Sequence, residues 1–502
     1  MSGIAVVGGG VGGLAVAARL AKMGHSVTLY EQACAVGGKL GWLEADGFRF
    51  DTGPSIVTFP EVFRNLWSFL GEPVTFDADA GLRRLDPIAR YRFADGTWFD
   101  AASDDIVFNR NIEQLRPGNA DEMRHFLDRA GRIWNATRGP FLESPLRGFG
   151  TLLKLASTQA RNLPTIAPWM TIRNLATAEL SDPRLVSFID RYATYTGSDP
   201  RKAPAALASI PYLERSQGGW YIDGGLRRIA NLLFQKCLDL GVAFHLNTPV
   251  DEIAVDAKGR VSGVRTDRTT HTYDLVVANV DARHLYADLI PREPKARRAL
   301  RSVRRVTPSL SGFVMLLGVK GPTPELAHHT VLFPERYNDE FDDVFGTRSK
   351  PPRPVRDPTI YLSVPDDPTL APPGHQAWFV LVNAPRHMPN ERSAGVDWNE
   401  PGLADRYGDR LLQILAERGI DVRDRIVHRT VRTPANLERD TRSVGGSIYG
   451  TSSNGTRAAF LRPANQSPVP GLFLVGGSSH PGGGLPLVTL SAQIVANLIG
   501  PA

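Results

Sequence analysis

The sequence predicts a mixed fold in which an α/β domain, assembled from separated segments, is joined to an α+β part with a mixed sheet and a helical lobe. Three observations predict it. The first 30 or so residues have the pattern of strand, glycine-rich turn, helix and strand, the opening βαβ unit of a Rossmann-like sheet. A second strand, glycine-rich turn and helix span Leu472–Leu498. Between them, Arg83 to Ala102 alternates apolar and polar residues as a sheet does, and Asp121 to Tyr212 has mostly helical spacing.

The composition is that of a globular protein of two or three domains. The chain has 502 residues, of which 42% are hydrophobic and 22% are charged. Its formal net charge of +6 is modest for this length, and ordinary solubility explains it as well as an anionic cofactor or an acidic membrane surface does. No basic block with interleaved aromatic residues occurs, so we expect no nucleic-acid partner.

The two cysteines, Cys34 and Cys237, are too few for a disulfide framework, and no cysteine and histidine cluster has zinc-ligand spacing. We therefore expect no metal, packing roles for both cysteines and a reducing, cytoplasmic location. The glycine-rich segment Ile4–Leu14 does not resemble a secretory signal. No other stretch approaches the roughly 18 uncharged apolar residues that a membrane-spanning helix needs.

The opening turn has the spacing of a dinucleotide-binding loop. Apolar Ile4–Val7 runs into Gly8-x-Gly10-x-x-Gly13, and a helical pattern follows. The first glycine allows the tight turn, the second lets a pyrophosphate approach the backbone, and the third lets helix and strand pack closely. Glu31 ends the second strand, where a carboxylate can accept hydrogen bonds from ribose hydroxyls. The alternatives are a purely structural turn and a solvated strand end.

The segments after this unit supply further elements in order. Two apolar strands, Val242–Leu246 and Leu275–Val280, flank a polar hairpin, and Arg348–Pro358 and Met388–Pro401 are polar loops. No second GxGxxG occurs at a strand–helix junction, so we expect no second nucleotide-binding domain. A helix after Gly224-Gly225 has one apolar face, made of Leu226, Ile229, Ala230, Leu233 and Cys237.

The C-terminal segment offers a second stretch of bare backbone. An apolar strand, Leu472–Val475, enters a turn that contains Gly482-Gly483-Gly484, and a helix follows. Glycines permit the close approach of a flat ring, and N–H groups in such a turn can stabilise negative charge on it. His480 is the one titratable side chain in this turn. It predicts either a contact to the cofactor or substrate, or a histidine bonded to the backbone.

The chain resembles the FAD-dependent family of amine oxidases, protoporphyrinogen oxidases and carotenoid desaturases. The resemblance rests on Gly37-Gly38-Lys39, on Asp51–Ser55 and above all on Gly471–Ile499, which is similar to the C-terminus of bacterial-type phytoene desaturases and related carotenoid oxygenases. Amine oxidases carry glutamate after the glycine that matches Gly477, where this chain has Ser478. The resemblance covers nearly the whole chain and implies bound FAD and an amine-oxidase-like architecture of two domains.

The implied architecture divides the chain. Residues 1–75, 215–280 and 450–502 are expected to form the discontinuous Rossmann-like FAD-binding domain. Residues 80–105 and 281–449 are expected to form the mixed-sheet substrate-binding domain, and residues 110–214 a helical lobe that associates with the membrane.

The resemblance also implies site residues. Lys39 and its preceding glycines would wrap the diphosphate and ribose, the backbone of Val250 would meet the adenine, and the C-terminal turn would lie beside the flavin. His480 is the one catalytic candidate, and no acid–base set is identified. The expected cofactor-binding residues are Gly8, Gly10, Gly12, Gly13, Glu31, Gly38, Lys39, Gly53, Pro54, Val250, Gly476, Gly477, Gly483, Leu485 and Pro486.

The implied reaction removes two hydrogens from an isoprenoid chain, by hydride transfer from an allylic carbon to the flavin and proton loss from the next carbon. A delocalised cation needs no strong base, which accounts for the lack of a Ser/His/Asp set or carboxylate pair. We expect a carotene or carotenoid precursor such as phytoene, neurosporene or a hydroxylated or C30 analogue, with quinone or oxygen as electron acceptor. Two alternatives stay open: a terminal-methyl oxygenase of the same family, and a non-catalytic lipid-escort protein, which would have a degraded phosphate turn.

An apolar substrate has to be recognised by shape and to enter from the bilayer. Leu146–Leu175 mixes large apolar residues with arginines and a lysine, which suits either a helix lying in a headgroup layer or a surface helix. We expect peripheral membrane contact there. Candidate wall residues, for each of which core packing is the competing explanation, are Trp134, Phe141, Phe149, Trp169, Tyr192, Tyr195, Tyr212, Trp220 and Tyr221.

Overall fold

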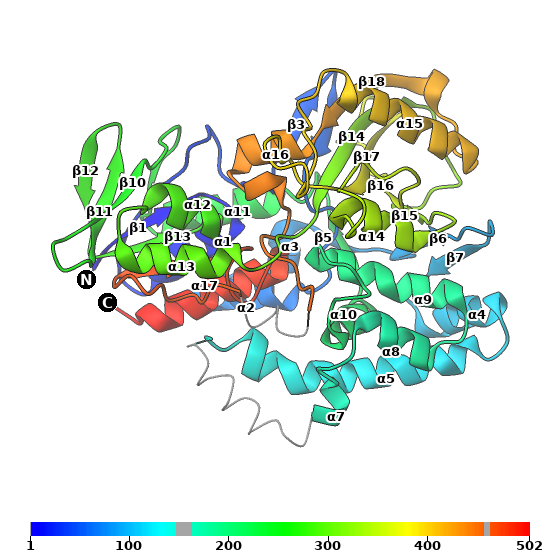
Figure 1. The fold of residues 1–502 in the computed structure, drawn as a ribbon, viewed down its shortest axis with the longest axis horizontal. Helices are drawn as coiled ribbons and strands as arrows, with labels where there is room; N and C mark the ends of the chain where they lie inside the picture. Colours follow the sequence, from blue (N-terminus) through cyan, green and yellow to red (C-terminus); the bar gives the residue numbers. More distant parts are fainter. Residues whose placement is uncertain (1, 147–162, 456–461) are drawn as a thin grey trace.

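The computed structural model describes residues 2–146, 163–455 and 462–502. A parallel sheet with its helices lies on one side of the molecule in Figure 1, a mixed sheet lies on the other, and a helical lobe lies below the mixed sheet. Both chain ends lie together at the edge of the parallel-sheet part. The chain passes through this part three times: near its start, again between about residues 220 and 280, and once more from β19 on.

The parallel sheet has five strands in the order β19-β13-β1-β2-β9. Every neighbouring pair in it is parallel. The strands are β1 (Gly3–Val7), β2 (Ser26–Tyr30), β9 (Ala243–His245), β13 (Leu275–Ala278) and β19 (Leu472–Leu474). Because β1 is central and covered on both faces, its residues from Ile4 on are all buried, the pattern of a parallel strand.

Three helices cover this sheet on one face. Helix α1 (Val11–Lys22) contacts both α17 (Leu485–Ile499) and α11 (Arg228–Asp239). The apolar face predicted for α11 is buried in the same core as α1. On the other side, a three-stranded antiparallel sheet of β10 (Glu252–Val255), β11 (Val261–Thr266) and β12 (Thr269–Thr272) packs with α13 (Pro294–Arg304).

The mixed sheet has seven strands in the order β18-β14-β17-β16-β15-β6-β7. Only the β15–β6 pair is parallel. Alternate residues of β14 enter different cores: Phe313, Met315 and Leu317 pack under α15 (Leu403–Glu417), and Val314 and Leu316 face the other way. The strands are β6 (Ala89–Arg92), β7 (Trp98–Ala101), β14 (Ser311–Lys320), β15 (His329–Leu332), β16 (Ile360–Ser363), β17 (His375–Ala384) and β18 (Ile426–Arg432).

The helical lobe consists mainly of α4 (Asp105–Leu115), α5 (Asn119–Thr137), α8 (Ile172–Glu179), α9 (Pro183–Asp190) and α10 (Ser209–Gln217). Its helices bury one apolar stripe each, as Met123, Phe126 and Ala130 do on α5. Most of the segment predicted to lie in a headgroup layer falls on residues 147–162, outside the described residues.

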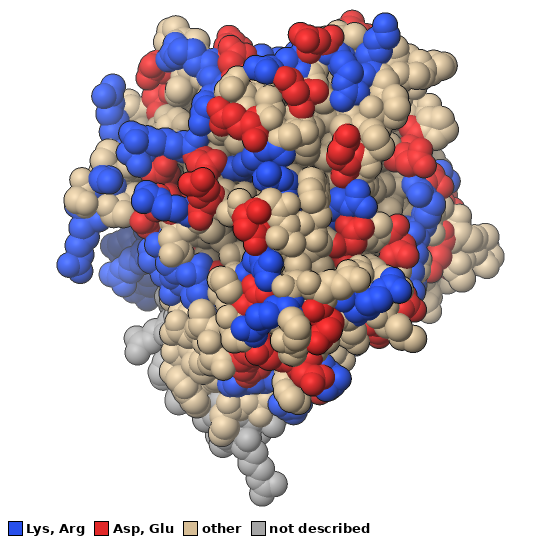
Figure 2. Space-filling model, turned by 90° about the vertical axis from the view of Figure 1, so that its right-hand side faces the viewer, with Lys and Arg blue, Asp and Glu red and all other residues tan. Residues whose placement is uncertain are grey.

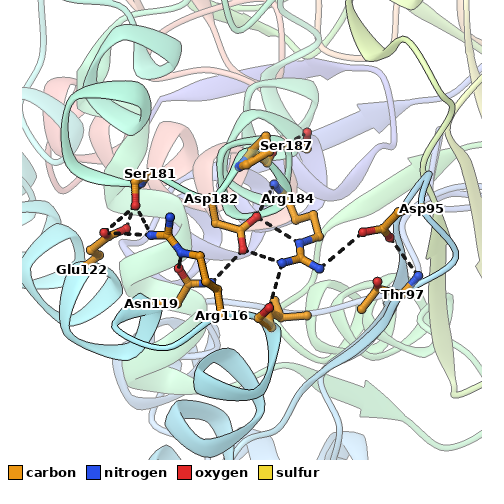
Figure 3. Close-up of polar contacts among 11 residues, drawn as sticks. Asp95, Thr97, Arg116, Asn119, Glu122, Ser181, Asp182, Arg184 and Ser187 are labelled. Carbon is orange, nitrogen blue, oxygen red and sulfur yellow. Dashed lines mark hydrogen bonds and ion pairs between the residues drawn. The ribbon is translucent and has the colours of Figure 1, made fainter.

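A polar network holds two helix ends of this lobe together (Figure 3). The buried Asp182 carboxylate caps α9 by accepting from the backbone N–H of Arg184, and it also accepts from the Arg184 guanidinium and from Asn119 at the start of α5. Burial alone would raise the pKa of Asp182, but the hydrogen bonds from Arg184 and Asn119 lower it to about 2. The carboxylate therefore remains charged and keeps α5 and α9 in register.

Positive and negative side chains are mixed on the molecular surface. Lysine and arginine side chains alternate with acidic ones over the face drawn in Figure 2.

The two cysteines differ in exposure. Cys237 is buried and Cys34 is exposed, so the packing role predicted for Cys34 is wrong: its loop, residues 32–35, lies at the surface. Within the described residues, no helix is both long and apolar enough to cross a membrane, and no group of three or more His, Cys, Asp or Glu side chains is placed to hold a metal ion.

Candidate functional site

One cavity of about 470 Å³ joins the two sheets. It begins at the carboxyl ends of the parallel strands, where its lining includes Gly8 after β1, Glu31 after β2, Asn279 after β13 and Gly476 after β19. It continues to the face of the mixed sheet at Tyr361 and its neighbours. Ligands of open α/β sheets bind at this edge, so we call its two parts the nucleotide half and the sheet half.

The opening turn has no room for side chains. Gly8 has a φ of +100°, which favours glycine, and a Cβ on Gly13 would lie 2.1 Å from the backbone oxygen of Gly8. Helix α1 begins at Val11 with no side-chain cap. Its first N–H groups are therefore available to an anion in the nucleotide half of the cavity.

Glu31 lies at the end of β2, as expected, and is buried. Its carboxylate accepts from the backbone N–H of Gly9 at 2.7 Å and from that of Ala33 at 2.9 Å. These two bonds hold the carboxylate against the turn, and a carboxylate has further lone pairs free to accept from hydroxyl groups of a ligand.

Asn279 connects the two glycine-rich turns. Its amide donates to the backbone oxygen of Gly8 at 3.2 Å. A Cβ on Gly10 would lie 2.9 Å from its Nδ2, and a Cβ on Gly476 would lie 2.5 Å from its Oδ1. Sequence reasoning missed Asn279, although its place directly after the apolar strand β13 could have indicated it.

Lys39, in the loop after β2, reaches across to the chain segment at Ser447 and Ile448. Its ammonium donates to the backbone oxygens of Ser447 and Ile448, each at 2.8 Å. Burial lowers the pKa of Lys39 to about 8, and the nearby Asp281 carboxylate opposes this effect. No carboxylate lies within ion-pair distance of Lys39 in the described part of the chain, so its charge is free to attract a phosphate in the cavity.

The segment Asp51–Pro54 is held under Lys39. A Cβ on Gly53 would lie 1.9 Å from the backbone oxygen of Lys39, so the two backbone segments are in direct contact. The Asp51 carboxylate accepts from the backbone N–H groups of Leu226 and Arg227, just before α11 begins, and burial raises the pKa of Asp51 to about 6. These contacts bring three distant chain segments to one wall.

The C-terminal turn lies opposite. Gly476 has a φ of +108°, and a Cβ on Gly483 would lie 2.9 Å from Tyr449. Helix α17 begins at Leu485 with Pro486 in its first turn and no side-chain cap. A second uncapped helix N-terminus therefore points at the same cavity as α1.

His480 does not line the cavity. It is fully buried, its Nε2 lies 3.0 Å from the backbone oxygen of Ser144, and its ring packs edge-on against Phe141. Burial lowers the pKa of His480 to about 4, so the ring is neutral near pH 7. Of the two explanations from the sequence, this placement matches the histidine bonded to the backbone.

The structure brings nearly all the expected cofactor-binding residues together. Gly13 lies behind the cavity wall, where it permits the contact between α1 and β1. The expected residues that line the cavity are Gly8, Gly10, Gly12, Glu31, Gly38, Lys39, Gly53, Pro54, Val250, Gly476, Gly477, Gly483, Leu485 and Pro486.

The sheet half has apolar and aromatic walls. Val314, Phe379 and Leu381 come from β14 and β17, and Tyr361 comes from β16. Of the nine aromatic residues proposed from the sequence, Tyr195 lines the cavity, and Phe149 lies outside the described residues. The sequence did not indicate the wall residues on β14, β16 and β17, because an inward-facing residue of a mixed sheet has the same sequence pattern whether it faces a core or a cavity. Further lining residues of this half are Leu310, Tyr337, Ile448 and Tyr449.

The nucleotide half fits a dinucleotide. Bare glycine backbone, two uncapped helix N-termini, a ribose-directed carboxylate and a lysine converge there, and an added Cβ would fill the space at several of the glycines. In the sheet half, a continuous wall of side chains is available to a flat ligand or to an apolar chain.

Comparison with known proteins agrees with this geometry. A family model described as flavin containing amine oxidoreductase matches residues 11–500. A 1-hydroxycarotenoid 3,4-desaturase from Flavobacterium sp. (strain P99-3) is 33% identical over 98% of both chains. A 4,4'-diapolycopene oxygenase from Methylomonas sp is 34% identical over 99% of this chain and 97% of that protein.

Solved structures share the fold. An oxidoreductase from Methanosarcina mazei superposes with a TM-score of 0.64 at 18% identity, over 99% of this chain and 100% of that one. A putrescine oxidase bound to putrescine gives a TM-score of 0.63 at 15% identity, over 99% and 98% of the two chains.

Proposed function

The chain belongs to the flavin containing amine oxidoreductase family and is an FAD-dependent oxidoreductase of the carotenoid-desaturase type, and from this premise we propose that it removes one hydrogen from each of two adjacent carbons of a carotenoid or carotenoid precursor. The observation that carries the proposal is the single cavity in which a dinucleotide cradle opens directly onto an apolar and aromatic wall. Such a wall suits an uncharged polyene, which offers shape and apolar surface for recognition.

Bound FAD supplies the two-electron oxidant. The residues of the nucleotide half would hold it: the turn after β1 and Lys39 would hold the diphosphate, Glu31 the ribose, the backbone of Val250 the adenine, and the turn from Gly476 to Pro486 the flavin ring. The sheet half orients the substrate carbons and excludes water.

The proton leaves without a strong base. Among the described residues that line the sheet half, none is a carboxylate or a histidine; Asp281, His284 and Asp440 lie with the nucleotide half. Loss of a proton from a carbon next to a delocalised cation is favourable enough to use a weak acceptor. The proposed chemistry therefore matches the side chains present.

A terminal-methyl oxygenase is the second candidate. The 34% identity to the diapolycopene oxygenase over nearly all of both chains supports it as directly as the desaturase relative supports the first. An escort protein is disfavoured, because the phosphate turn is intact and uncapped.

Product masses separate the candidates. We expect the purified, flavin-loaded protein to convert a hydroxylated or unmodified polyene into products lighter by two hydrogens per step, with a soluble quinone replacing oxygen as electron acceptor under anaerobic conditions. Chromatography with mass spectrometry measures this. Products heavier by oxygen, formed only in air, would identify the oxygenase. Flavin-loaded protein that changes none of the polyenes offered would refute both candidates.

We also propose peripheral membrane contact through the lobe. Trp169 lies between α7 (Leu163–Ile166) and α8, in the part of Leu146–Leu175 that the structure describes, and it is 64% exposed. Exposed tryptophan is favoured at the boundary of headgroups and acyl chains. We expect wild-type protein to float with anionic liposomes at low salt and Trp169→Ala to float several-fold less. Trp98→Ala is the control, because Trp98 is also exposed but lies on β7. Equal flotation of the two variants would contradict this placement.

A further inference from the structure

Arg191 is a buried cation in the sheet half of the cavity. It begins the short helix η3 (Arg191–Thr196), lines the cavity and is 8% exposed. Its Nη1 donates to the hydroxyl oxygens of Tyr91 at 3.1 Å and Tyr195 at 3.2 Å. These phenols are its only hydrogen-bond acceptors, and no carboxylate lies within 4.0 Å of it, among the residues the structure describes.

Donors of Arg191 remain free. A guanidinium has five N–H donors, and the bonds to the two phenols use only Nη1. No described residue accepts a hydrogen bond from Nε or Nη2. Because Arg191 lines the cavity, these donors are available to a ligand there. A buried donor left without an acceptor is costly, which favours an acceptor on the ligand.

Aromatic rings fix the guanidinium in place. Its central carbon lies 5.5 Å from the ring centroid of Tyr91, 5.1 Å from that of Tyr195 and 5.7 Å from that of Tyr361. Cations at such distances over aromatic rings are held by the ring quadrupole. The arginine is therefore a pre-positioned donor and costs little ordering when a ligand arrives.

The Glu214 carboxylate lies on the far side of Tyr195 from Arg191 and is linked to it through the Tyr195 hydroxyl. Tyr195 accepts from Arg191 and donates to the buried Glu214 carboxylate at 3.3 Å, and Tyr192 donates to the same carboxylate at 2.5 Å. Burial raises the pKa of Tyr195 well above its ordinary value, so it remains a donor. Burial raises the pKa of Glu214, and the hydrogen bonds from the two tyrosines and the charge of Arg191 oppose that rise. With Glu214 ionised, an anionic ligand would leave a net negative charge in this enclosed site, whereas a neutral acceptor oxygen would not.

The same cluster reaches the cofactor side. The hydroxyl of Tyr361 lies 2.6 Å from the Ser55 hydroxyl, and Ser55 directly follows Pro54 in the wall of the nucleotide half. One tyrosine ring thus separates Arg191 from the loop beside the cofactor. A substrate group bound at Arg191 would therefore lie in the same cavity as the cofactor.

We propose that Arg191, supported by Tyr195, binds a neutral acceptor oxygen, a hydroxyl or carbonyl, on the end group of the polyene and so selects substrates that carry one. The inference rests on the proposed function of the cavity. Arg191 contacts the substrate and determines specificity; the oxidation itself needs only the bound cofactor and the carbon pair.

The test compares two polyenes that differ only in a terminal hydroxyl. For wild-type holoenzyme we expect a higher kcat/KM with the hydroxylated polyene. Arg191→Met should lower kcat/KM for that substrate by about 10- to 100-fold, mainly through KM, because a hydrogen bond to a charged donor is lost. For the plain hydrocarbon, kcat/KM should change by less than about threefold. The control is Arg129→Met, which removes an arginine paired with Glu179 in the same lobe, outside the cavity.

The outcomes are distinct. An equal loss for both polyenes, or a hydrocarbon preference in the wild type, would overturn the inference while leaving the proposed function intact. Tighter binding of a polyene with a terminal carboxylate than of the hydroxylated one, seen as a shift in the flavin spectrum, would overturn the neutral-oxygen assignment. If neither polyene is oxidised by wild type, the proposed function fails instead. Should Arg191→Met lose its flavin or its thermal stability, Arg191→Lys, which keeps the charge but loses the planar fork, should show the same selective loss.

Discussion

Gly13→Ala protein is expected to purify without flavin. The new Cβ would lie 2.1 Å from the backbone oxygen of Gly8 and 2.9 Å from Nδ2 of Asn279, so α1 has to move away from β1 and from Asn279. Such overpacking costs about 1–3 kcal/mol, and the moved atoms are those that form the phosphate cradle. We expect FAD affinity to fall by about 10- to 100-fold, measured as flavin absorbance per protein and by reconstitution of the apoprotein.

Gly139→Ala is the matched control for this experiment. Among the described residues, a Cβ added to Gly139 would meet no heavy atom within 4 Å beyond its chain neighbours and its own helix backbone, and the φ of Gly139 is not in the left-handed region. That variant should bind flavin as the wild type does. A yellow Gly13→Ala protein with a normal ratio of FAD to protein would mean that the turn does not contact the cofactor as proposed. Circular dichroism and thermal melting of the variant show whether any loss of flavin comes from loss of the fold.

FAD affinity should fall as pH rises above about 8. Burial sets the pKa of Lys39 near 8 in the protein without ligand, so the ammonium that attracts the diphosphate is complete below that pH and is lost above it. A bound phosphate raises the pKa of this lysine, so binding takes up a proton, and affinity should decrease by up to about tenfold per pH unit above 8. Titration of apoprotein with FAD between pH 7 and 9.5 measures the slope.

Lys39→Gln should bind FAD more weakly at pH 7 and show no such slope. Lys22→Gln, which changes a lysine at the far end of α1, should keep both the affinity and the slope of the wild type. An unchanged slope in Lys39→Gln would assign the pH dependence to another group of the nucleotide half and remove Lys39 from the diphosphate site.

The sequence predicted the elements with strong local patterns. The turn from Gly8 to Gly13 and the turn before Leu485 lie where strand, glycine and helix patterns adjoin, because backbone geometry there allows little but glycine. The sheet half was harder to predict. Tyr361 and Arg191 are far apart in sequence, and only the pairing of β16 within the seven-stranded sheet and the packing of the lobe bring them together.

Two residues illustrate the limits further. His480 looked chemically active because it stands in a glycine-rich turn, yet its ring is turned to the backbone of Ser144, an orientation that no local pattern encodes. Asn279 contacts both turns, but a single polar residue after a strand has no spacing signature. Long-range packing decides both cases.

The position of Asn279 also bears on biogenesis. Its amide donates to Gly8 in the turn after β1, and a Cβ on Gly476, in the turn after β19, would lie 2.5 Å from its Oδ1. The strand pair β13–β19 closes a loop of nearly 200 residues, and contacts of such separation form slowly. A nascent chain can fold its mixed sheet and lobe before α17 emerges, but the proposed flavin site needs both turns. We therefore expect cofactor binding to come late in synthesis, and the segment from β19 to α17 to be as necessary for it as the turn from Gly8 to Gly13.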